Sequence, residues 1–202
     1  MLHRIPALMG SGKPVAVLFT EEEGIESALL YCELIQKARS GESFFIKNQG
    51  CSVGAYVLGE TEKSPGDYYY SSGRYRDEEA IKRAVSNLNR LSRKGTSIKI
   101  TPYSGEDFDI LILFLKPERA MRLIQAYTYS SGIPVEIKTG GIASICSDCT
   151  SSPTQGRLGI SLGCKGSRKH SKYPDDEVVV GVPFQIACEI DEALGRIPET
   201  HS

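Results

Sequence analysis

Two short runs of apolar residues constrain the fold of this chain more than any other feature. Residues 14–19 read P-V-A-V-L-F and residues 109–115 read D-I-L-I-L-F-L, and polar residues do not alternate inside either run. A strand with apolar side chains on both of its faces must be covered on both faces, as in a sheet with helices on each side. Gly12 and Pro14 mark the start of the first run, which we expect at the centre of the sheet. These runs predict a layered α/β protein.

Helical patterns alternate with shorter strands along most of the chain. The spacing of apolar residues predicts helices over residues 25–39, 77–91, 117–129 and 183–194. Further strands are predicted at residues 43–46, 97–100, 135–137 and 177–181. Asp77 is the expected N-cap of the second helix, and Pro117 the first residue of the third. This alternation predicts a single α/β domain over residues 1–202, with helices on a mixed sheet and loose ends at about residues 1–10 and 197–202.

Composition excludes several classes of function. The chain has 24 Lys and Arg residues against 25 Asp and Glu, and its isoelectric point is about 6.3, so it lacks the basic surface that nucleic-acid backbones require. The apolar run from Ile110 to Leu115 is too short to cross a bilayer, and residues 1–13 contain no apolar core of a signal peptide. We therefore expect a cytoplasmic protein that binds neither nucleic acid nor membrane. In a reducing cytosol its six cysteines serve metal binding, catalysis or core packing and not disulfides.

Sulfur, glycine and positive charge coincide between residues 140 and 168. Cys164 lies in G-C-K-G-S-R beside Lys165 and Arg168, and nearby cations favour the thiolate, which is the form that binds metals and attacks electrophiles. Cys164 is therefore the candidate nucleophile. The same loop has a second interpretation as a cradle for a small anionic ligand, in which the two cations act with backbone N–H groups near Gly140, Gly141, Gly163 and Gly166. The alternative is that this loop is an ordinary turn between strands with no function in binding.

The sequence C-S-D-C places Cys146 and Cys149 at a spacing that brings two thiolates to one metal ion. Cys164 follows alone, where a zinc ribbon would have a second close pair. His170 could add an imidazole ligand, although a histidine among lysines is usually only solvated.

Residues 59–76 read as a long polar connection that contains D-Y-Y-Y-S-S-G-R-Y. Such connections are mobile or functional more often than they are inert. If the glycine loop is an anion cradle, residues 68–76 are expected to cover it as a lid.

Several segments in one order carry a resemblance to a known family. They include P-V-A-V at residue 14, C-S-V-G-A-Y-V-L-G from Cys51, G-D-Y-Y-Y-S-S-G-R-Y from Gly66, G-G-I-A-S-I-C-S-D from Gly140 and S-L-G-C-K-G-S-R from Ser161. Over nearly its whole length the chain resembles domain of unknown function 169, a family of archaea and anaerobic bacteria with no established activity to transfer. The resemblance implies that four cysteines match family positions, namely Cys32, Cys51, Cys146 and Cys164, and that Cys149 and Cys188 are particular to this chain.

Four cysteines are the number that an iron–sulfur cluster needs, and ligands from separate segments suffice if the fold brings them together. The compact ferredoxin spacing is absent. Cys32 has the alternative of packing as a small hydrophobe on a helix face, which is the role expected of Cys188 beside Phe184 and Ala187.

These observations lead to one function and two alternatives. The first is an iron–sulfur cluster or another thiolate-bound metal, held by Cys32, Cys51, Cys146 and Cys164 beside a small-ligand pocket. The second is a binding module without metal, in which Lys165 and Arg168 hold a small anion and the cysteines only pack. The third is a thiol enzyme with Cys164 as nucleophile. The sequence names no substrate and no oligomeric state.

Overall fold

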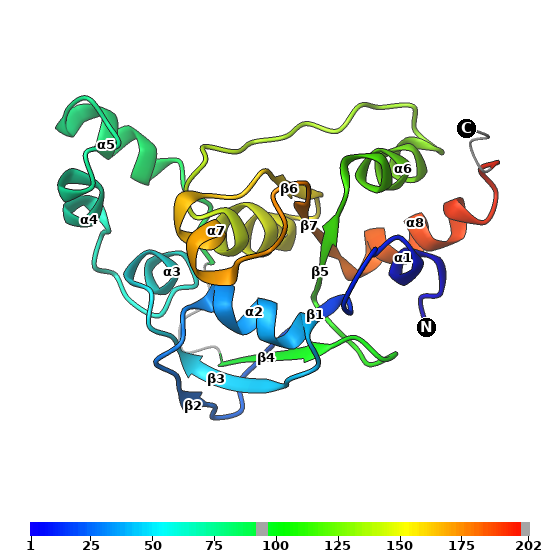
Figure 1. Cartoon of the computed structure of the whole chain (residues 1–202), viewed down its shortest axis with the longest axis horizontal. Coiled ribbons are helices and arrows are strands. Elements are labelled where there is room, and N and C mark those ends of the chain that lie inside the picture. Colours follow the sequence, from blue (N-terminus) through cyan, green and yellow to red (C-terminus); the bar gives the residue numbers. More distant parts are fainter. Residues whose placement is uncertain (92–96, 199–202) are drawn as a thin grey trace.

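The computed structural model describes residues 1–91 and 97–198, and within them seven strands form one sheet in the order β2-β3-β4-β1-β5-β7-β6 (Figure 1). The strands are β1 Val15–Thr20, β2 Ile25–Glu26, β3 Phe44–Asn48, β4 Ser97–Pro102, β5 Ile110–Leu115, β6 Gly159–Ser161 and β7 Val178–Pro183. In the part of the chain that is described, β2 and β3 pair in parallel and the other neighbours pair antiparallel. The first apolar run therefore lies in the central strand, as predicted.

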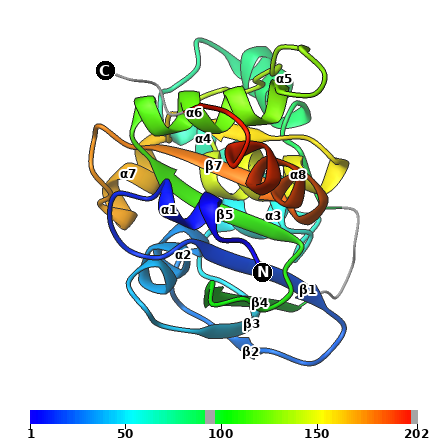
Figure 2. The ribbon, with the colours of Figure 1, turned by 90° about the vertical axis from the view of Figure 1, so that its right-hand side faces the viewer.

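Helices cover both faces of the sheet, which confirms the predicted α/β layers. One face packs against α2 Tyr31–Arg39, α3 Ser52–Val57 and the π-helix η1 Ser144–Ser151, with α7 Lys165–Ser171 beside α2. The other face packs against α1 Arg4–Ala7, α6 Pro117–Thr128 and α8 Phe184–Leu194, which stand in front of the sheet in Figure 2. Two further helices, α4 Gly66–Ser71 and α5 Glu78–Ser86, extend beyond α3 (Figure 1), and the short 3-10 helix η2 Ser152–Gln155 follows η1.

Strand β5 shows why an uninterrupted apolar run is required. Side chains of a strand alternate between its faces, so this strand contributes to both hydrophobic cores. Ile110, Ile112 and Phe114 join the core under α2 and η1, while the three intervening leucines join the core under α6 and α8. All six residues are buried.

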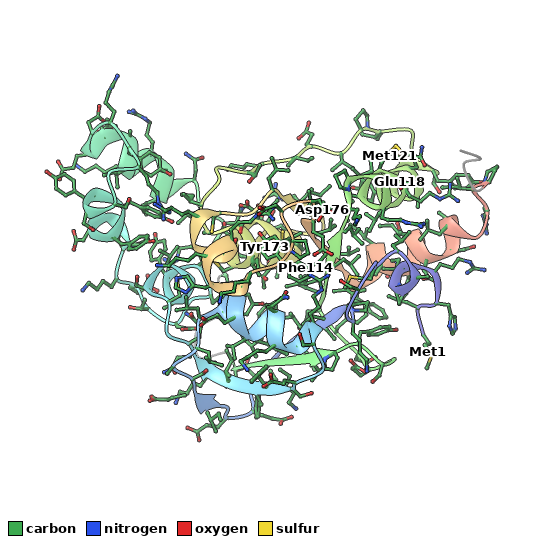
Figure 3. All side chains as sticks on the ribbon, viewed as in Figure 1. Met1, Phe114, Glu118, Met121, Tyr173 and Asp176 are labelled. Carbon is green, nitrogen blue, oxygen red and sulfur yellow. The ribbon has the colours of Figure 1, made fainter. Side chains whose placement is uncertain are left out.

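A buried ion pair and two aromatic rings connect α2, β5 and the α7–β7 loop. The guanidinium of Arg39 donates to both carboxylate oxygens of Glu177 at 2.7 Å, and both side chains are about 95% buried. The same guanidinium lies 4.6 Å from the ring centroid of Phe114, whose ring meets that of Tyr173 at 5.1 Å (Figure 3). The guanidinium of Arg168 lies over the ring of Tyr173, 4.4 Å from its centroid. The contact with Tyr173 therefore holds Arg168 within the protein framework.

The predicted helix starts are largely confirmed, with two changes of length. Helix α6 begins at Pro117, and the Asp77 carboxylate accepts from the backbone N–H of Ala80 at 2.8 Å as the N-cap of α5. That helix ends at Ser86 and not at residue 91. The helix predicted over residues 25–39 begins only at Tyr31, because residues 25 and 26 pair with β3 and the Glu33 carboxylate accepts from the Leu30 backbone N–H at 2.8 Å.

Other predictions of elements were wrong. Residues 135–137 form no strand, because the edge of the sheet next to β7 is taken by β6, which the sequence did not predict. Helices η1 and α7 were not predicted either. The N-terminal residues are not loose, since Leu2, Ile5 and Leu8 are buried and the Asp191 carboxylate accepts from backbone N–H groups at the start of α1. Of the expected loose segment 197–202, residues 199–202 lie outside the described residues.

Candidate functional site

A pocket of about 300 Å³ lies where four helices of one sheet face begin. Its walls come from the first turns of α2, α3, η1 and α7, and from the tyrosine-rich segment around α4. Four of the six cysteines line it, one from each of these first turns: Cys32, Cys51, Cys146 and Cys164. Sulfurs that are far apart in sequence therefore face one cavity.

Two of these cysteines are helix N-caps. The Sγ of Cys51 accepts from the backbone N–H of Gly54 at 3.4 Å at the start of α3, and the Sγ of Cys164 accepts from that of Ser167 at 3.3 Å at the start of α7. The Ser167 hydroxyl in turn accepts from the Cys164 backbone N–H at 3.0 Å, which completes a capping box. The first N–H groups of a helix have no partner within the helix, and here they point at sulfur.

The thiol of Cys164 has a lowered pKa although the side chain is half-buried. Burial raises the pKa, but hydrogen bonds from Ser144 and Ser167, which stabilise the thiolate, outweigh it. The hydroxyls of these serines lie 2.9 Å apart and join the first turns of η1 and α7. The lowered pKa expected from the sequence is therefore present, but its causes are helix-terminal donors and not the neighbouring lysine and arginine.

Burial raises the pKa of two other thiols that line the pocket, those of Cys32 and Cys146. For Cys32 it rises to about 11, mainly through burial, with smaller contributions from Cys51 and Cys164. For Cys146 it rises well above the ordinary value through burial and then through the charges of the other three cysteines. Electrostatic interactions between thiolates weaken with distance. That Cys51 and Cys164 raise the pKa of both Cys32 and Cys146 therefore agrees with four thiols around one cavity.

The turn before η1 holds an unusual backbone conformation at the pocket wall. Ala143 has φ 50° and ψ 36°, a left-handed conformation that a residue with a Cβ rarely adopts. It turns the chain so that η1 starts inside the protein, and its carbonyl accepts from the Ser147 backbone N–H at 2.7 Å and from the Cys146 thiol at 3.5 Å. Such strain is common at functional sites.

The remaining two cysteines lie outside the pocket. Cys149 is fully buried and its thiol donates to the carbonyl of Val179 on β7, so Cys146 and Cys149 do not face the same cavity. Cys188 is half-buried on α8, which covers the opposite face of the sheet. The metal pair suggested by the C-S-D-C spacing is therefore wrong, because the π-helix turns its second cysteine towards the sheet.

Tyr68, Tyr69 and Arg74 form the outer wall, and His170 also lines the pocket. Tyr69 is 1% exposed, and its ring contacts those of Tyr68 and Tyr75 edge-on at 5.3 and 5.9 Å. His170 lies with Nδ1 3.8 Å from a carboxylate oxygen of Glu33. The predicted lid segment thus lies at the pocket as part of its wall.

Comparison with known proteins places the chain in a family. Residues 7–193 match the family described as uncharacterised ArCR, domain of unknown function 169. The chain belongs to this family. It is also similar to an uncharacterised protein of Methanocaldococcus jannaschii, with 30% identity over 183 residues that cover 85% of this chain and 78% of the other. No solved structure matches the chain.

Within the residues described for this family member, no helix is long and apolar enough to cross a membrane. Over the same residues, no three His, Cys, Asp or Glu side chains are arranged so that they could hold a metal ion. The four cysteines line one cavity, but their present arrangement gives no support to binding of a single ion.

The cations of the predicted anion cradle lie outside the pocket. Arg168 donates to the backbone carbonyls of Leu162 and Pro174 at 2.7 Å and of Glu177 at 2.9 Å, and Lys165 is exposed. Of the four glycines named for this role, Gly166 lines the cavity, while Gly140 and Gly141 are exposed in the turn before η1. A side chain at Gly163 would overlap the Tyr173 hydroxyl, so that glycine serves close packing.

Sequence reasoning missed the residues that organise the site without carrying sulfur. Gln49 is 7% exposed, and its Oε1 accepts from the backbone N–H groups of Cys51 at 2.7 Å and Tyr31 at 3.2 Å, which joins the starts of α2 and α3. Among the described residues, the cation that lines the pocket is Arg74, whereas Lys165 and Arg168 were predicted there. The one signal for Arg74 was its place in the tyrosine-rich segment.

Proposed function

We propose that this protein binds an iron–sulfur cluster through Cys32, Cys51, Cys146 and Cys164, with the rest of the pocket open to a small ligand. The observation that supports the proposal is that four cysteines from four separate segments line one cavity. Free cysteines are often buried as small hydrophobes, but a shared solvent-accessible pocket is not needed for core packing.

The arrangement of the candidate ligands among the described residues does not support a single tetrahedral ion. A tetrahedral zinc with Zn–S bonds of about 2.3 Å holds its sulfurs only about 3.8 Å apart. Among the described residues, no three candidate ligands are arranged so that they could hold a metal ion. In a four-iron cluster each cysteine binds a different iron, so the sulfurs stand farther apart around a larger core.

The chemistry of the cavity also suits a cluster. The raised pKa values of Cys32 and Cys146 mean that these buried thiols are reluctant to ionise without a cation, and metal ions remove a thiol proton outright. Backbone N–H groups of Gly54 and Ser167 already point at two of the sulfurs. Hydrogen bonds of this kind stabilise thiolate ligands and tune cluster potential.

The test is anaerobic purification and reconstitution followed by iron and sulfide analysis. Wild type is expected to hold about four iron and four sulfide per chain, as in a [4Fe–4S] protein. Cys51→Ser and Cys164→Ser should lose the iron while remaining folded, because serine is a good N-cap. Cys188→Ala is the matched control and should keep it. Wild type with no more iron than the serine variants would refute the cluster.

A second candidate, a thiol enzyme, is favoured by the lowered pKa of Cys164. In this case Cys164 should be alkylated by iodoacetamide at a pH below the ordinary thiol range of about 8.5. Mass spectrometry of the digested protein would compare the alkylation rate of Cys164 with that of Cys188 at each pH. Equal alkylation rates of the two at each pH would contradict a nucleophilic role.

A further inference from the structure

The outer wall of the pocket carries a cation that has no acidic partner among the described residues. Arg74 is the only arginine or lysine that lines the pocket among the described residues, and no carboxylate there pairs with it. Its Nη2 donates to the Tyr68 hydroxyl at 3.2 Å, and its guanidinium lies 5.5 Å from the centroid of the Tyr68 ring. By contrast, the nearby Arg76 pairs with Asp77 at 2.7 Å.

The guanidinium is therefore held in place with donors to spare. Arginine has five N–H donors in a planar fork that matches a carboxylate. Tyr68 is supported by the buried ring of Tyr69, which fixes the wall that carries both groups. The Tyr68 hydroxyl accepts from Arg74 and keeps its own hydrogen free to donate.

The lining of the pocket is mostly apolar. Leu30, Val53 and Ile145 line the pocket together with the ring of Tyr69. A volume of about 300 Å³ lies at the lower end of small-molecule sites. The ligand must accordingly be small, with a charged end and an apolar body.

We propose that the pocket binds a small organic carboxylate, with its charge on Arg74 and the Tyr68 hydroxyl and its apolar body against Leu30, Val53 and Ile145. Phosphate fits less well, because no lysine or second arginine among the described lining residues would share its larger charge. The inference extends the proposed function by naming the ligand class of the same pocket. It rests on the cavity of that proposal and not on the presence of iron.

The probes are benzoate and its neutral analogue benzamide, titrated into the full chain by calorimetry. Benzoate should bind more tightly than benzamide. Arg74→Gln should weaken benzoate by about tenfold to a hundredfold, the range for a lost hydrogen bond to a charged group. Arg74→Lys should recover only part of the loss, because lysine cannot form the bidentate fork.

Arg76→Gln is the matched control, since Arg76 is exposed and lies outside the pocket lining; it should bind benzoate as wild type does. Equal binding of benzoate and benzamide, or unchanged benzoate binding by Arg74→Gln, would overturn the inference. Acetate and butyrate test ligand size, and absence of binding by all three carboxylates at millimolar concentration would also overturn it. If the reconstituted protein binds benzoate but holds no iron, only the proposed cluster is refuted. If it holds iron but binds none of the carboxylates, only this inference is refuted.

Discussion

Glu60 provides a sharp test of the electrostatics beside the pocket. Its Oε2 accepts from the backbone and side-chain N–H groups of Gln49, both at 3.2 Å, while its Oε1 is buried and has no hydrogen-bond partner among the described residues. Burial raises the pKa of this carboxyl from 4.5 to about 7, although the bonds from Gln49 oppose the rise. The proton is therefore held more tightly in the folded protein than in the unfolded chain.

The sign of the effect on stability follows from this difference. Below a pH of about 4.5 both states are protonated and the stabilising contribution is complete; it is lost as the pH rises through about 7. A shift from 4.5 to about 7 would correspond to about 3 kcal/mol at 1.36 kcal/mol per unit. Because the side chain is only partly buried, solvent screening reduces the expected contribution to about 1–2 kcal/mol.

The variant Glu60→Gln keeps an oxygen acceptor for Gln49 and cannot ionise. Urea unfolding should show little difference from wild type near pH 4, and the variant should be about 1–2 kcal/mol more stable near pH 8. Glu42→Gln is the control, since Glu42 is exposed and pairs with Lys37 at the surface; it should change the pH dependence by less than about 0.5 kcal/mol. A difference between Glu60→Gln and wild type that stays constant from pH 4 to 8 would refute the raised pKa of Glu60.

Three further substitutions test the packing around the site. Gly181→Ala should prevent stable folding, because a Cβ there would overlap the carbonyl oxygen of Cys149, where η1 lies on β7; a wild-type thermal transition would contradict this close packing. Arg39→Met should lower the free energy of unfolding by about 3–5 kcal/mol, since it leaves the buried Glu177 unpaired, and the added change Glu177→Gln should restore much of the loss in urea unfolding. Cys188→Ala should cost only about 1 kcal/mol and leave any bound iron unchanged, because Cys188 lies behind the opposite face of the sheet; loss of iron would place Cys188 at the metal centre.

The sequence by itself determined the helices and strands that form because of their own residues and not because of distant partners. The apolar run of β5 needs cover on both faces whatever surrounds it, and Pro117 and Asp77 start α6 and α5 through their own backbone and side-chain chemistry. The resemblance to the family also selected the four cysteines that line the pocket.

Only the tertiary structure decided which elements pack together, and whether some segments form a helix, a strand or neither. The sequence of α7, K-G-S-R-K-H-S, has no apolar period, and its helix depends on the Cys164 cap and on packing against α2. Residues 135–137 have a strand-like composition but no strand to pair with, while the short β6 exists because β7 offers it an edge. The π-helix η1 points Cys146 into the cavity and Cys149 at β7, a division that two cysteines at this spacing do not reveal. Pairing, capping and packing partners come from distant parts of the chain, so a local pattern cannot specify them, and the pocket exists only where these partners meet.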